Sequence, residues 1–325
     1  MEKYLKTPQE TAQLILSGRK LLLAGNEDLL SKLPQGEWIA GTSPYFMDID
    51  GGQVCQDKIF VNDITDFQEE ISIKVYTEDT IKNIYKDGFD NGFTVLIIPP
   101  YSNVHTEFAV HAPDYENFAT RPLMGWVSCY SFPQDNKSSK TFFKTGNSGS
   151  TTNAVAMHVK LPKNKYAEMD LINLYTQGNG DEIIFLEDGF NAKDVLINKE
   201  KQNFAEYIRK KHIDTTLPIV ANYNSAMINV SIESLSTNQV NLLAPVFKDV
   251  KYRFAKSIEN LESDFQKFAV KNNVNPVCAS ICILLYYYAK LEGKQCGNIY
   301  APITNGEICY QLVNQTVVTL EIKDV

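Results

Sequence analysis

The chain ends in two β-rich runs that are separated by a short polar turn. In residues 316–322 apolar and polar side chains alternate with a period of two, which predicts a strand with one buried face. The turn before it contains Thr304, Asn305, Gly306 and Glu307. Residues 297–323 therefore predict a polar loop that is carried on a rigid β scaffold.

The rest of the chain alternates between short strand patterns and short helix patterns. Thr7, Pro8 and Glu10 form a capping-box signature that predicts a helix from residue 8 to about residue 17. Buried or alternating strand patterns recur along the whole length, with Gly, Pro and Asn turns between them. We expect a mixed α/β (α+β) fold whose sheets are mixed, largely antiparallel and flanked by helices.

Two tracts, residues 20–63 and 182–249, share one order of elements. Each contains a strand, a helix, a Leu-Pro pair, a second strand, a polar turn and a third strand, and each is followed by a helix and a buried apolar run. This order predicts an internal duplication with a first α/β half at residues 1–163 and a second at residues 164–325. The alternative is coincidence, since α/β chains often share such orders. Under duplication, a cleft between the halves is the expected place for a small ligand.

Three further segments carry specific expectations. Residues 77–87 have the pattern of an amphipathic helix, and the glycine-rich residues 146–150 predict a loop. Residues 277–289 form the longest apolar run, which is too short for a bilayer that takes ~20 residues and predicts a buried element.

Composition and charge exclude several classes of protein. A net charge of -8 argues against general nucleic-acid binding, which needs a basic surface. The N-terminus shows no apolar signal region, and none of the six cysteines forms a C-x-x-C pair, so we expect reduced thiols in a cytoplasmic protein without membrane contact. No P-loop, G-x-G-x-x-G, H-E-x-x-H or G-x-S-x-G motif is present, and we expect no cofactor, no metal and no catalytic residue.

The candidate ligand-binding residues lie in polar turns at strand ends. Small and hydroxyl residues after a strand allow a ligand to approach the backbone, although a plain bend with a packed tyrosine has the same pattern. Glu307 could accept a hydrogen bond from a ligand amine or be a turn carboxylate, and Arg253 could bind a carboxylate or be an exposed strand charge. The full candidate set is Gly41, Thr42, Ser43, Tyr45, Asn222, Asn224, Arg253, Asn305 and Glu307.

The closing stretch resembles the end of FIST-type bacterial sensory domains. The resemblance rests on Gly306 and Glu307, then Asn314, then the pair Gln315 and Thr316, with an apolar tail at residues 317–320. Residues 39–43 resemble the N-terminal part of that family, where a strand ends in Gly and small hydroxyl residues. Residues 217–221 stand where the family has a Pro-initiated strand that runs into a glycine pair, but here Ala221 and Asn222 replace the glycines. The pattern is that of a divergent relative, in an uncharacterised bacterial family of its own.

The resemblance implies a sensor of small molecules such as amino acids, with a signalling protein as partner, and it would move the domain boundary to about residue 256. The leading hypothesis is a ligand-binding, sensor-like protein with a polar cleft. Two alternatives stay open: a hydrolase-type enzyme that uses Ser43 or a cysteine, and a non-catalytic scaffold or interaction protein.

Overall fold

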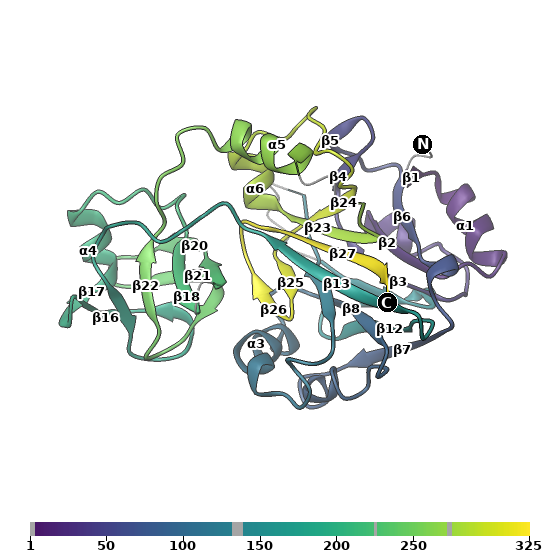
Figure 1. Ribbon diagram of the computed structural model, residues 1–325, viewed down its shortest axis with the longest axis horizontal. Helices are drawn as coiled ribbons and strands as arrows, with labels where there is room; N and C mark the ends of the chain where they lie inside the picture. The colour runs from purple at the N-terminus through teal and green to yellow at the C-terminus, as the bar shows by residue number, and fades with distance from the viewer. Residues whose placement is uncertain (1–3, 132–138, 224–225, 272–274) are drawn as a thin grey trace.

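The computed structural model describes residues 4–131, 139–223, 226–271 and 275–325. Three six-stranded sheets make up a larger part, which we call the body. Residues 177–255 form a smaller part at one end of it, which we call the inserted lobe (Figure 1). The expected mixed α/β class with largely antiparallel sheets is confirmed.

The three sheets of the body share one strand plan. In each, the third and fourth strands are parallel and all other neighbours are antiparallel. The first sheet has the order β1 (Leu5–Lys6), β6 (Ile59–Asp63), β2 (Leu21–Gly25), β3 (Trp38–Thr42), β10 (Thr141–Phe143), β11 (Thr145–Ser150). The second has the order β7 (Glu70–Tyr76), β12 (Ala154–Lys160), β8 (Gly92–Ile98), β9 (Leu123–Val127), β25 (Glu307–Cys309), β26 (Gln311–Val313). The third has the order β13 (Lys165–Ile172), β27 (Val317–Asp324), β23 (Cys278–Cys282), β24 (Ala301–Thr304), β4 (Tyr45–Asp48), β5 (Gly51–Val54).

The plan repeats three times along the chain, and the repeats exchange hairpins. Residues 5–63, 70–160 and 165–324 each supply four strands to a sheet of their own and one hairpin to a neighbouring sheet. The hairpin β4–β5 completes the third sheet, β10–β11 completes the first, and β25–β26 completes the second. This exchange ties the repeats into one ring, because each sheet is finished by a strand pair from elsewhere in the sequence.

The predicted two-fold duplication is not confirmed, because the strand order repeats three times. The predicted boundary at residue 163 falls between β12 and β13, so the first predicted half contains two repeats and the second contains one. The extra length of the last repeat is the inserted lobe, which separates β13 from β23. The alternative boundary near residue 256 lies where the inserted lobe ends.

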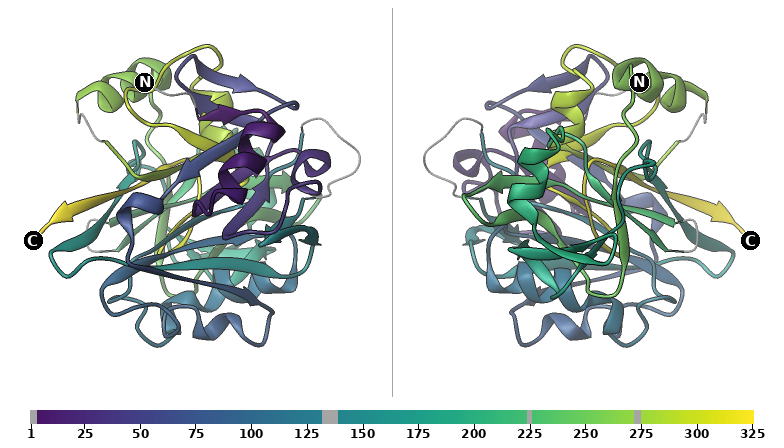
Figure 2. Two further views of the ribbon diagram at one scale, coloured as in Figure 1. Left: turned by 90° about the vertical axis from the view of Figure 1, so that its right-hand side faces the viewer. Right: turned by 90° about the vertical axis from the view of Figure 1, so that its left-hand side faces the viewer.

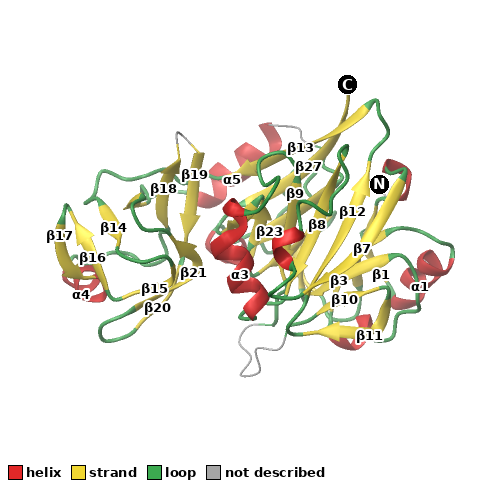
Figure 3. Cartoon of the chain, turned by 90° about the horizontal axis from the view of Figure 1, so that it is seen from below, coloured by secondary structure: helices red, strands yellow, loops and turns green. Residues whose placement is uncertain are grey.

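The inserted lobe is built almost wholly of antiparallel strands. One sheet has the order β17 (Glu200–Asn203), β16 (Asp194–Ile197), β14 (Ile183–Phe185), β22 (Lys251–Phe254), β18 (Ile219–Tyr223), β19 (Ala226–Val230). A second has the order β15 (Gly189–Ala192), β21 (Val240–Val246), β20 (Ile232–Leu235), and α4 (Phe204–Lys210) packs at the far end. Seen from below, α3 (Asn103–His111) of the body lies between the inserted lobe and the strands of the body (Figure 3).

Two apolar clusters hold these parts together. A central cluster joins inward side chains of all three sheets, including Ile39, Val95 and Val318, each fully buried. A second cluster continues from Phe108 of α3 to Phe185 of the inserted lobe, so the lobe is packed onto the body through apolar contact. Burial of apolar area is the dominant stabilising term for such contacts. In side view β13 and β27 run side by side and reach out from the body (Figure 2).

The short helices show how local sequence sets element ends. The capping box of α1 (Pro8–Leu16) is confirmed, with the Thr7 hydroxyl accepting from Glu10 N and the Glu10 carboxylate accepting from Thr7 N. The remaining α-helices are α2 (Glu27–Leu30), α5 (Leu261–Lys271) and α6 (Ile283–Tyr288). Every helix among the described residues is too short or too polar to cross a lipid bilayer.

Three local predictions need correction. Residues 77–87 form turns and the 3₁₀ helix η2 (Ile81–Asn83) instead of an α-helix, because most of their backbone hydrogen bonds reach only three residues back, as from Asn83 N to Thr80 O at 3.0 Å. Residues 146–150 belong to strand β11, since tertiary pairing with β10 overrides their glycine content. The apolar run at 277–289 is a strand followed by a helix, β23 and α6, where one buried element was expected.

Candidate functional site

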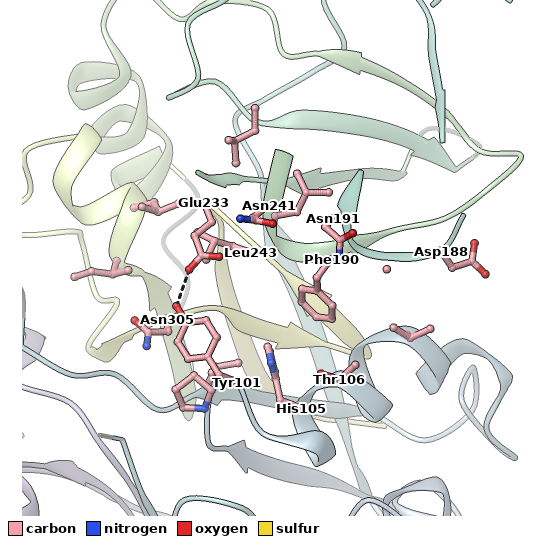
Figure 4. Close-up of a pocket in the computed structure, with 18 of the residues that line it drawn as sticks. Tyr101, His105, Thr106, Asp188, Phe190, Asn191, Glu233, Asn241, Leu243 and Asn305 are labelled. Carbon is pink, nitrogen blue, oxygen red and sulfur yellow. Dashed lines mark hydrogen bonds between the residues drawn. The ribbon is translucent and has the colours of Figure 1, made fainter. Parts of the chain in front are cut away.

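A cleft of about 1080 Å³ lies between the body and the inserted lobe. Its size matches pockets that enclose small organic ligands, typically about 300–1,000 Å³. The floor comes from segments that follow the carboxyl ends of the parallel strands β8, β9, β23 and β24, which is the edge where α/β sheets usually bind ligands. The roof comes from β15, β20 and β21 (Figure 4). The polar and aromatic residues of the two walls are Tyr101, His105, Thr106, His111, Tyr130, Tyr288 and Asn305 from the body, and Asp188, Phe190, Asn191, Glu233 and Asn241 from the inserted lobe.

His105 is the buried titratable group of the cleft. Its side chain leaves α3 toward Phe190 of the lobe, with ring centroids 5.4 Å apart (Figure 4). The residue is 8% exposed, and its ring nitrogens make no hydrogen bond with any described residue. Burial lowers the pKa of His105 to about 4, so the imidazole is neutral near pH 7. A neutral imidazole offers one donor and one acceptor, and both are available to a ligand.

Tyr101 and Glu233 connect the two walls of the cleft. The Tyr101 hydroxyl donates to Glu233 Oε1 at 3.1 Å, from the segment after β8 to β20 of the inserted lobe. Tyr101 has φ 58°, a left-handed conformation that is uncommon for a residue with a Cβ. Burial, and then the charge of Glu233, raise the pKa of Tyr101, so its hydroxyl remains a donor. This strained backbone aims an aromatic side chain across the cleft.

Under the cleft, the ends of β3, β9 and β24 form a closed set of contacts. Cys129 N donates to Thr42 O at 2.7 Å, and Asn305 N donates to Val127 O at 3.1 Å. The third link runs from Ser43 Oγ to Ile303 O at 2.6 Å. The register of the parallel pairs makes Ser43, Ser128 and Asn305 equivalent, since each follows the last residue of the second parallel strand. The floor of the cleft is therefore fixed by one strand end from each repeat.

Of the described candidate residues, only Asn305 lines the cleft. Its amide nitrogen donates to Ser128 O at 3.0 Å, and its Oδ1 accepts from Cys129 Sγ at 3.2 Å. Both groups of the side chain are thus tied to the end of β9, which fixes its orientation at the rim of the floor. The predicted polar turn at residues 304–307 contributes to the site through this residue.

Gly41, Thr42 and Ser43 lie at the end of β3 and serve the packing of the body. A Cβ at Gly41 would lie 2.7 Å from an Ile97 methyl carbon, so glycine is required for close packing against β8. Thr42 and Ser43 line a separate hollow of about 270 Å³, which shares Tyr130 with the cleft. The Ser43 hydroxyl donates to a backbone carbonyl and is fully buried, a geometry that does not support a nucleophile.

Tyr45 and Glu307 are buried beneath the surface. Tyr45 is 2% exposed, and its hydroxyl accepts from Tyr287 at 2.9 Å. Glu307 is fully buried, and its Oε2 accepts from Thr316 Oγ1 at 2.8 Å. Burial raises the pKa of Glu307 well above its usual range, which favours a neutral carboxylic acid in the floor. Both residues support the cleft from below without reaching it.

The two remaining described candidates lie on the inserted lobe outside the cleft. Asn222 is exposed on β18, and the Arg253 guanidinium donates to the backbone carbonyl of Gly180. Asn224 lies outside the described residues. The structure therefore does not bring Thr42, Asn222 and Glu307 into one pocket.

The residues of the cleft floor could have been predicted from the sequence, whereas those of the roof could not. Tyr101 and His105 follow the break after the buried strand β8, and Ser128 follows β9 in the same way that Ser43 follows β3. A search for polar residues in the segments that follow each buried strand would have found these positions. Glu233 and Asn241 have no such signal, because only the packing of the lobe against α3 brings them to the cleft.

Within the described ranges, no group of three His, Cys, Asp or Glu side chains is arranged to hold a metal ion. All six cysteines are free thiols. Burial raises the pKa of Cys129 beside the cleft floor, which opposes thiolate chemistry there.

Comparison with known proteins yields one match. No curated protein and no solved structure gives a significant match to the chain. A family model described as a family of unknown function, DUF6976, matches residues 6–323, which include all three repeats and the inserted lobe. The chain belongs to this family, DUF6976.

Proposed function

We propose that this protein binds a small organic molecule in the cleft between the body and the inserted lobe and acts as a sensor-like protein. The observation that carries the proposal is the neutral, nine-tenths buried His105, which faces an open volume of about 1080 Å³ without a described hydrogen-bond partner. Because the ring borders the cleft, its donor and its acceptor are both available to a bound ligand.

The way the cleft is built suits a sensor. Its two walls belong to different parts of the molecule and are joined by the Tyr101–Glu233 hydrogen bond, so a bound ligand contacts both. A ligand that binds more tightly at one spacing of the walls would increase the fraction of molecules with that spacing. A signalling protein that binds only this conformation would then respond to the ligand. The free thiols suit a cytoplasmic location, where disulfides are rare.

The test is a set of melting curves over a panel of neutral, cationic and anionic metabolites. A compound that binds only the folded protein raises Tm in proportion to its concentration relative to Kd. Thr106→Trp, at an exposed helix position on the cleft wall, should reduce or abolish the shift, because the indole takes space beside His105 that the ligand would occupy. The matched control is Gln13→Trp, an exposed position of α1 at the opposite end of the body (Figure 1). The proposal fails if no compound raises Tm, or if Thr106→Trp leaves every shift intact.

A further inference from the structure

We infer that the cleft selects an organic cation: a protonated amine on an aromatic or apolar frame that carries no carboxylate. The inference rests on the proposed function and names the ligand class of that same site. It departs from the amino-acid ligand that the sequence resemblance implies, and the difference lies in the charge and aromatic character of the described walls.

Two carboxylates belong to the cleft walls, and His111 on the body wall lies with its Nε2 3.8 Å from the carboxylate of Glu107. The lobe wall contributes the carboxylates of Asp188 and Glu233, and no lysine or arginine occurs among the described lining residues. The chain as a whole carries a net charge of -8. Carboxylate ligands are usually held by arginine forks or lysines, and here a ligand carboxylate would meet like charge instead. An ammonium group would be attracted by the same walls, which also raises its local concentration.

The aromatic groups favour a cation with a flat or apolar body. Tyr101, Tyr130 and Tyr288 come from the body and Phe190 from the lobe, so rings line both sides. Aromatic faces attract ammonium groups by about 0.5–2 kcal/mol and also pack against apolar frames.

His105 completes the recognition of a donor-rich ligand. Because the pKa of His105 is lowered to about 4, the ring carries no positive charge that would repel an amine near pH 7. Its unprotonated nitrogen can accept a hydrogen bond from an ammonium, as can the amide oxygens of Asn191 and Asn241 across the cleft. An ammonium donates up to three hydrogen bonds, and the Asn241 oxygen keeps a second lone pair for one of them beside its contact with Gln239 Nε2 at 3.0 Å.

The experiment is isothermal titration of the full chain with matched pairs that differ by one carboxylate: tyramine against tyrosine, phenethylamine against phenylalanine, and agmatine against arginine. At least one amine should bind tenfold or more tightly than its amino acid. Glu233→Gln should weaken that binding at least tenfold, because it removes a charge while keeping the shape of the side chain. Glu200→Gln, an exposed carboxylate at the far end of the lobe, should leave it unchanged.

The outcomes separate this inference from the proposed function. The inference is overturned if the amino acids bind as tightly as their amines, or if Glu233→Gln has no effect on amine binding. If no amine binds while neutral or anionic compounds do, and Thr106→Trp blocks them, the ligand class is wrong and the binding function stands. If nothing binds at all, both fail.

Discussion

The Tyr101 hydroxyl donates a hydrogen bond to Glu233 across 3.1 Å and so joins the body to the inserted lobe over the cleft. The two residues are 132 positions apart in the sequence, and their contact exists because a lobe inserted in the third repeat packs on α3 of the second. The same pair contributes an aromatic ring and a carboxylate to the walls. It links the architecture of the fold to the proposed recognition of a ligand.

Replacing Tyr101 by phenylalanine should affect binding more than folding. The hydrogen bond lies at an exposed position, so its loss should lower the free energy of unfolding by about 0.5–1.5 kcal/mol at most. Ligand binding should weaken more than this, because the hydrogen bond between Tyr101 and Glu233 no longer holds the two walls of the cleft at their spacing. Urea unfolding and calorimetric titration measure the two effects. Tyr166→Phe, on exposed strand β13, is the matched control and should change neither; a Tyr101→Phe variant with unaltered affinity would contradict the expectation.

The protein should lose stability as the pH rises because of Glu307. Burial raises its folded-state pKa, so its contribution is fully present below the unfolded value of about 4.5 and is lost as the pH rises through the folded pKa. Over that window the free energy of unfolding should fall by up to about 1.4 kcal/mol per pH unit for this one proton. Urea unfolding of the wild type and Glu307→Gln as a function of pH isolates the effect, because glutamine cannot ionise. If the free energies of unfolding of the two proteins changed with pH in the same way, the pKa of Glu307 would be equal in the folded and unfolded states, and the expectation would be wrong.

His105 should act in the opposite direction on acidification. Its folded-state pKa is lowered to about 4 from 6.5, so its contribution is fully present above pH 6.5 and is lost as the pH falls toward 4. The whole effect is about 3 kcal/mol, on the basis of about 1.36 kcal/mol per pKa unit. The difference between the unfolding curves of the wild type and His105→Gln should shrink over this range. His158, buried in β12 with its pKa also lowered to about 4, adds the same trend to both proteins and cancels in the comparison. If the difference in free energy of unfolding between the two proteins stayed constant over this pH range, the pKa of His105 would not be lowered, as expected for a ring that is exposed to water.

Ser43→Ala should destabilise the floor of the cleft. The substitution removes the hydroxyl that donates to Ile303 O at 2.6 Å and leaves a buried carbonyl without this partner. The expected cost is about 1–3 kcal/mol in thermal or urea unfolding. Ser17→Ala is the control, since the Ser17 hydroxyl also donates to a carbonyl, at 2.8 Å, but at an exposed helix end where water can replace it. Equal losses of stability in the two variants would mean that the contact between the ends of β3 and β24 adds no more to the stability than an exposed hydrogen bond does.

The sequence predicted the local elements well and their assembly poorly. The capping box at Thr7 and the buried strands β2, β8 and β12 follow from nearest neighbours alone, so pattern reasoning located them. The exchange of hairpins among three repeats depends on pairings such as Phe46 with Pro302, which no local pattern encodes. The second of the two matching tracts, residues 182–249, lies entirely inside the inserted lobe, so its similarity in element order to residues 20–63 was a coincidence, and the three true repeats were not found.

The candidate site shows the same division. Asn305 was found because it follows a buried strand, and Glu307 was noticed for its charge, although it supports the floor from within. Asn222 was chosen on the assumption of two equivalent halves, and Arg253 was chosen as a strand cation that could bind a carboxylate; both lie on the lobe away from the cleft. Glu233 was invisible to sequence reasoning, because its role depends on where the whole lobe docks.

Hydrogen–deuterium exchange, with and without the compound that raises Tm most, tests the central claim most directly. If the ligand binds in the cleft, exchange should slow in both walls: residues 100–106 and 283–288 of the body, and residues 188–191 and 231–243 of the lobe. Segments far from the cleft, such as α1, should be unchanged beyond a general stabilisation. Protection that is confined to other surfaces, with both walls unaffected, would contradict binding between the body and the inserted lobe.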